Sequence, residues 1–142
     1  MSLIVTNVVC TAALVGLVWT AQLVHYPLMR FVGPATFGVY HADHVRRMTW
    51  VAAPLMAAEA IAAAALAAHP WPMGAGWAWM SAVLTLICWL STMMLQVPLH
   101  RELALGGLDE TLIERLVRTN WIRTGAWTAR LAILIAAGSS GL

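Results

Sequence analysis

The side chains best suited to chemistry concentrate in one short stretch, FGVYHADHVRRMTW, at residues 37–50. His41 and His44 are three residues apart, so a helix places them on one face, with Asp43 beside them. Two further histidines stand near the ends of other apolar segments, at His25 and His100. Neutral imidazole is the commonest metal ligand in proteins. Where these segment ends meet in one layer, the four histidines predict a site for copper, iron or haem b.

Other polar residues lie near the same segment ends. A metal-bound imidazole needs a partner that fixes its tautomer, and Asp43, Gln22 and Gln96 are suited to that role. Further side chains are predicted to bind or orient a cofactor or substrate there: Tyr26, Asn120, Trp121 and Arg123. A flat aromatic molecule is the ligand that this aromatic and polar set favours.

The elements that must position these residues are strongly apolar. The chain has 142 residues, of which 61% are hydrophobic and 10% charged. A helix that crosses about 30 Å of hydrocarbon needs roughly 20 apolar residues, and the stretches near 3–29, 48–68, 76–99 and 119–137 qualify. None has the alternation of a membrane barrel strand. We therefore predict one all-α integral-membrane domain, a four-helix transmembrane bundle with helical cytoplasmic extensions. Gly33 with Pro34 is expected to start one extension, with the proline in its first turn, and Asp109 is expected to cap the other.

Charge placement predicts how this bundle is oriented. All eight basic residues are arginines, and seven of them fall at one end of the four predicted spans. By the positive-inside tendency that end is cytoplasmic, which places both termini outside. The net charge of +2 then follows from topology, so we expect a lipid bilayer and no nucleic acid as partner.

One acidic and one basic residue lie deep within the predicted spans. A shift of 71 residues superimposes PLMR on PLHR and sets Glu59 opposite Arg130. Each stands nine residues beyond a tryptophan near the cytoplasmic interface, about 13 to 14 Å into the bilayer. Because a lone charge there is costly, we predict that they form an ion pair. Its role stays open between a structural clip and a proton relay or substrate contact.

Three short motifs carry a family resemblance. VHYPL, VPLHREL and NWIRTGAWTARLAIL resemble the pattern of the bacterial anthrone oxygenase-like membrane family. The matching positions are His25 and Pro27, then Pro98, His100 and Arg101, then Trp121, Arg123 and Thr124. The resemblance implies a small oxygenase or oxidase of aromatic compounds in the bacterial inner membrane. Members of that family need no obvious cofactor, whereas the additional histidine pair of this chain favours a metal or haem.

Three interpretations from different functional classes follow. The first is a membrane oxidoreductase for a lipophilic aromatic or quinone-like compound. In it the histidines hold a metal or haem, and acid–base or electrostatic roles fall to Asp43, Glu59, Arg123 and Arg130. The alternative is a non-catalytic membrane subunit or small-molecule binder whose histidines and arginines dock a partner or lipid headgroups. A proton-coupled transporter is the weakest interpretation. Small-residue stretches such as AAEAIAAAALAAH allow close contact between helices of two copies, so a homodimer is also compatible with the sequence.

Overall fold

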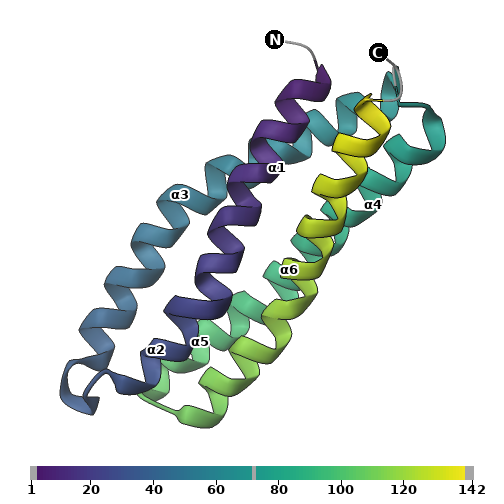
Figure 1. The fold of residues 1–142 in the computed structure, drawn as a ribbon. Helices are drawn as coiled ribbons and strands as arrows, with labels where there is room; N and C mark the ends of the chain where they lie inside the picture. Colours follow the sequence, from purple (N-terminus) through teal and green to yellow (C-terminus); the bar gives the residue numbers. More distant parts are fainter. Residues whose placement is uncertain (1–2, 72, 140–142) are drawn as a thin grey trace.

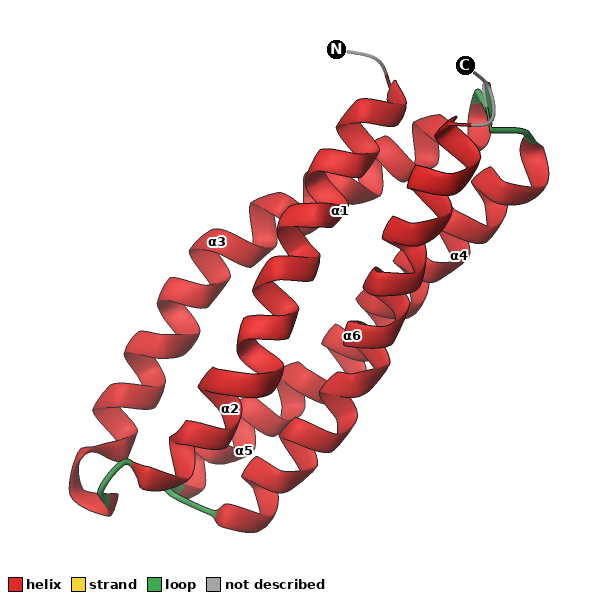
Figure 2. Ribbon diagram, in the orientation of Figure 1, coloured by secondary structure: helices red, strands yellow, loops and turns green. Residues whose placement is uncertain are grey.

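The computed structural model describes residues 3–71 and 73–139, and every regular element in those residues is helical (Figures 1 and 2). Four long helical columns follow one another along the chain. The first combines α1 (Leu3–Thr20), the π-helical turn η1 (Ala21–His25), α2 (Tyr26–Leu28) and the 3-10 turn η2 (Met29–Phe31). The second is α3 (Pro34–Ala68). The third combines α4 (Ala75–Ser91), the π-helical turn η3 (Thr92–Gln96) and α5 (Val97–Gly106), and the fourth is α6 (Glu110–Ser139).

Three of these columns are long and apolar enough to cross a membrane: Leu3–Phe31, Pro34–Ala68 and Ala75–Gly106. The all-helical class and a membrane protein are therefore indicated, as the sequence predicted. By the same measure of length and composition, α6 falls short. The middle of α6 carries Asn120, Arg123 and Arg130, which lower the mean hydropathy of this helix. A fourth span and the direction of insertion remain predictions.

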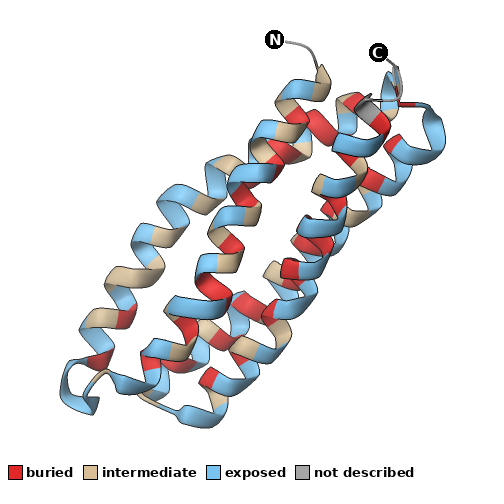
Figure 3. Ribbon diagram, viewed as in Figure 1, coloured by how far each residue is buried: buried red, intermediate tan, exposed pale blue. Residues whose placement is uncertain are grey.

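The side chains are distributed in the way expected of a protein surrounded by lipid. Polar residues such as Asn7, Glu59 and Arg130 are fully buried between the helices, while Ile61 and Met94 are 73% and 68% exposed. Buried positions follow the inner faces of the columns and exposed ones the outer faces (Figure 3). An apolar outer surface of this extent would be a liability in water. It is the natural surface for helices in hydrocarbon.

The columns pack in a ring in which α1 and α4 each contact both α3 and α6. The start of α1 and the end of α6 lie at one end of the bundle, and α2 and α5 lie at the other (Figure 1). At that second end two predicted helix starts are confirmed. Gly33 precedes Pro34, the first residue of α3, and Asp109 caps α6 by accepting a hydrogen bond from the Leu112 N–H at 3.1 Å.

Two π-helical turns interrupt equivalent places in the two halves. η1 and η3 begin 71 residues apart, the same shift that superimposes PLMR on PLHR. Each is followed by a proline at the second residue of the next helix, Pro27 in α2 and Pro98 in α5. Proline lacks an N–H and its ring crowds the carbonyl four residues earlier. A wider turn before it relieves that conflict, and such turns are frequent at functional sites.

Candidate functional site

A cavity of about 410 Å³ lies among all four columns, towards the end that carries α2 and α5. Its deep wall is apolar and includes Leu14, Val18 and Met56. Its other wall carries most of the histidines and Arg123. Pockets of a few hundred cubic ångströms with apolar walls and a few polar groups are typical of small-molecule sites.

A chain of hydrogen bonds runs along the polar wall. Arg123 Nη2 donates to the Tyr26 hydroxyl at 3.2 Å, which lies 3.4 Å from His100 Nε2. His100 Nδ1 is 3.1 Å from His41 Nε2. Because a guanidinium only donates, the Tyr26 O–H is free to donate to His100. On that assignment the Nδ1 proton of His100 goes to His41, and His41 Nδ1 carries a proton with no partner in the described residues.

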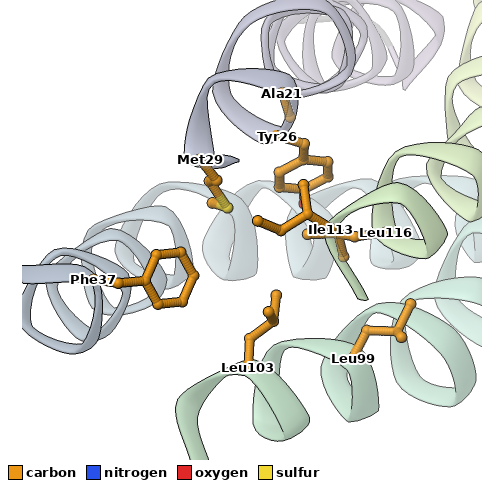
Figure 4. Packing of buried hydrophobic residues seen from close by; sticks show 8 residues of the cluster. All are labelled: Ala21, Tyr26, Met29, Phe37, Leu99, Leu103, Ile113 and Leu116. Carbon is orange, nitrogen blue, oxygen red and sulfur yellow. The ribbon is translucent and has the colours of Figure 1, made fainter. Parts of the chain in front are cut away.

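Local packing explains why the side chains of this hydrogen-bonded chain are held in place. Tyr26 follows the π-helical turn η1 and is only 4% exposed. The Phe37 ring stacks on the His41 ring with centroids 5.5 Å apart. Phe37 and Tyr26 belong to a buried cluster that includes residues of α5 and α6 (Figure 4). This cluster fills the end of the bundle beyond the cavity. Its members are Ala21, Tyr26, Met29, Phe37, Leu99, Leu103, Ile113 and Leu116.

His44 differs from His41 and His100, the two histidines of the hydrogen-bonded chain. It lines the cavity and is partly buried. Its ring centroid is 6.1 Å from that of His100 and 6.2 Å from that of Tyr40, but its nitrogens make no hydrogen bond to other described residues. His25 lies behind it, with ring centroids 5.7 Å apart, and does not line the cavity. Three of the four predicted histidines therefore meet at one cavity wall, with the fourth next to His44.

The donor set fits a metal or haem poorly in this arrangement. Within residues 3–71 and 73–139, no group of three or more His, Cys, Asp or Glu side chains is placed to hold a metal ion. The facing nitrogens of His41 and His100 are 3.1 Å apart. Metal–imidazole bonds are about 2.0–2.1 Å long, so two ligands on opposite sides of a haem iron would stand about 4 Å apart. Copper, iron or haem b at these histidines remains a prediction.

The predicted orienting amides support Arg123 more than the histidines. Asn120 Oδ1 accepts a hydrogen bond from Arg123 Nε at 3.0 Å, and Asn120 Nδ2 donates to Gln22 Oε1 at 2.8 Å. Gln96 lines the cavity and donates to the Thr119 hydroxyl at 2.9 Å. Its own Oε1 is buried with no partner in the described residues.

Two other predicted site residues lie away from the cavity. Asp43 forms ion pairs with Arg46 and Arg47, and all three side chains are substantially exposed. Trp121 is 48% exposed and meets Trp19 edge to face, with ring centroids 5.5 Å apart. Neither lines the cavity.

The predicted ion pair is confirmed, in a separate polar layer. Arg130 Nη1 donates to Glu59 Oε1 at 2.9 Å, and both side chains are fully buried. The other Glu59 oxygen accepts from Trp127 Nε1 at 2.9 Å, and Arg130 Nη2 donates to Asn7 Oδ1 at 2.6 Å. Thr11 bonds to both charged groups. Neither Glu59 nor Arg130 lines the cavity.

Two residues near Arg123 were not among the predicted site residues. The Thr92 hydroxyl accepts from Arg123 Nη1 at 3.2 Å. The Trp127 ring lines the cavity, and the Arg123 guanidinium lies 5.9 Å from its centroid. A spacing of four residues in a helix was a usable signal for Trp127. Thr92 sits among hydrophobic and small residues and gave no comparable signal.

Comparison of the chain with protein-family models, with curated proteins and with solved structures finds no significant match.

Proposed function

We propose that this protein is a membrane oxidoreductase of the oxygenase type, which acts on a lipophilic aromatic compound bound in the cavity. The carrying observation is the cavity wall itself. It combines His44, whose ring nitrogens are uncommitted, with the hydrogen-bonded chain from Arg123 to His41. Such a wall can remove a proton from a bound molecule and redistribute it, which general acid–base catalysis requires.

In this proposal α6 is the fourth span of the bundle. Within the predicted span, residues 119–137, the two charged residues Arg123 and Arg130 are both buried, while Ile122 and Ile135 on the outer surface are 45% and 56% exposed. The arginine-rich end faces the cytoplasm by the positive-inside tendency, and both termini lie outside. In a bacterial inner membrane the cavity would then lie in the inner half of the bilayer, where lipophilic aromatics partition.

The substrate class we favour is an aromatic compound with an acidic C–H or O–H group, such as an anthrone. His44 takes the proton, which leaves an electron-rich carbanion or enolate in the cavity. Dioxygen is the oxidant. One of its oxygen atoms becomes the oxygen of a new ring carbonyl at the former methylene carbon, and the other leaves as water with the two hydrogens of that methylene. The substrate loses four electrons and dioxygen gains four, so the reaction balances without a further reductant.

His44 also defines the experiment. Oxygen uptake by the purified protein with anthrone should fall about 10²- to 10⁴-fold in His44→Gln, the usual contribution of a general base. His69→Gln is the matched control, because His69 is exposed at the opposite end of the bundle. Equal uptake in the two variants would remove His44 from the mechanism.

A parallel measurement addresses the cofactor and the alternative function. Metal analysis and a visible spectrum of the same preparations would reveal copper, iron or haem retained by the wild type and lost in His41→Ala. In that case the histidines hold a cofactor. Saturable anthrone binding without oxygen uptake, in a preparation that is colourless and free of metal, would instead favour a non-catalytic binder.

A further inference from the structure

Arg123 is a buried cation that has no counter-ion in residues 3–71 and 73–139. The Arg123 residue is only 9% exposed. Its hydrogen bonds go to Asn120, Thr92 and Tyr26, all of them neutral. These bonds engage four of the five N–H groups that a guanidinium has. An ionised group in a poorly hydrated site is strongly unfavourable unless an opposite charge compensates it.

The acidic residues of the chain are all either engaged in ion pairs with other arginines or exposed. Glu59 pairs with Arg130, and Asp43 pairs with Arg46 and Arg47. The other four acidic residues are exposed: Glu102, Asp109, Glu110 and Glu114. Among the described residues, then, no carboxylate is left to neutralise Arg123.

The cavity beside Arg123 has the matching electrostatic character. A second arginine, Arg101, also lines it, and no acidic residue does. The Trp127 ring covers one side of the Arg123 guanidinium, and the deep wall is apolar. A negative group placed at the polar wall would be attracted to both arginines, and the aromatic body attached to it would lie against Leu14, Val18 and Met56.

We propose that the cavity binds its aromatic ligand as an oxyanion, a phenolate or enolate, with Arg123 as its counter-ion. This rests on the proposed function for the aromatic nature of the ligand, and it adds the charge state and the residue that selects it. The ligand supplies the negative charge that the chain does not place next to Arg123. Neutral aromatics of the same shape bind more weakly, because they leave the buried guanidinium uncompensated.

The test uses 4-nitrophenol, whose phenolate has its own visible absorption, and its neutral methyl ether, 4-nitroanisole. The wild-type protein in detergent is titrated under nitrogen, so that no oxygenation takes place. A cation within contact distance lowers the pKa of an acid by about one to three units. We expect that fall for the bound probe, which means that the phenolate binds about 10- to 1000-fold more tightly than the phenol.

Three variants locate the effect. Arg123→Gln should abolish the shift, and Arg123→Lys, which keeps the charge, should retain most of it. Arg115→Gln, an exposed arginine on the same helix, should leave it unchanged. The proposal is overturned when the bound probe titrates as it does in solution, when Arg123→Gln keeps the shift, or when 4-nitroanisole binds as tightly as the phenolate.

Two comparisons distinguish this proposal from a fatty-acid site and from the oxygenase proposal. In the first, 1-naphthol and decanoate, which carries a negative charge on an aliphatic chain, are compared as competitors of 4-nitrophenol. Decanoate should compete weakly. If decanoate displaces the probe at a lower concentration than 1-naphthol does, the site binds a fatty acid instead. Because the titration is anaerobic, a normal shift together with absent oxygen uptake would refute the oxygenase and leave the anion site standing. Oxygen uptake without a shift would do the reverse.

Discussion

Two buried arginines on α6 stand seven residues apart, two turns of the same helix, and have opposite surroundings. Arg130 faces a carboxylate, bonds to Asn7 and Thr11, and does not line the cavity described above. Arg123 faces only neutral groups and borders a cavity of about 410 Å³. The difference teaches how to separate structure from function among buried charges. We infer that a charge neutralised by the chain serves the fold, whereas a buried charge that the chain leaves without a counter-ion is available to a ligand.

The strongest way to break this comparison is to remove Arg130. Arg130→Met leaves Glu59 ionised in a dry interior, which should lower the free energy of unfolding by about 3–5 kcal/mol. Thermal unfolding in detergent measures the loss. The double variant Glu59→Leu with Arg130→Met should recover part of it, because no unpaired charge remains. A single variant as stable as the wild type would mean that the pair does not clip the helices.

Trp127 connects the two layers, and its replacement gives a smaller effect. Trp127→Phe keeps a ring beside Arg123 but removes the N–H that bonds to Glu59 Oε2. Loss of one hydrogen bond to a charged group should cost about 1.5–3 kcal/mol. Chemical denaturation and the 4-nitrophenol titration are measured on the same variant. We expect lower stability with an unchanged probe shift; the opposite pattern would place Trp127 in the anion site.

Arg123 should give the smallest change in stability. Arg123→Met removes hydrogen bonds to Asn120 and Tyr26, but it also removes an uncompensated cation, and these contributions oppose each other. The unfolding free energy should therefore stay within about 1 kcal/mol of the wild-type value. Comparison with Arg130→Met under identical conditions makes the measurement. A loss equal to that of Arg130→Met would erase the distinction between the two residues.

Features set by local pattern or chain register were predicted well from the sequence. The Gly33–Pro34 start of α3, the Asp109 cap of α6 and the Glu59–Arg130 pair all appear as expected. Helix starts depend on a few neighbouring residues. The ion pair was predicted from matching depth, which residue counting gives, together with the cost of turning either charge towards lipid.

Features that depend on how the helices rotate were harder to predict. The sequence placed the histidines in one layer, but it did not show that His41 and His100 would bond to each other or that His25 would stand outside the cavity. It also gave no sign that Asn120 and Gln22 would support Arg123. Each of these contacts depends on a few tens of degrees of rotation, which periodicity read over an apolar helix does not resolve.

The π-helical turns at Ala21–His25 and Thr92–Gln96 make that rotation adjustable. Such a turn accommodates one extra residue, so everything beyond it is displaced by one position, about 100°, relative to an unbroken α-helix. The first column thus aims Asn7 and Thr11 at the ion pair on one side of the turn and Tyr26 at the cavity on the other. In the first and third columns, the helical segments before and after the π-helical turn therefore have separately set rotations about the helix axis. A one-residue deletion at either joint would re-aim the lining of the cavity while the layer around Glu59 kept its register.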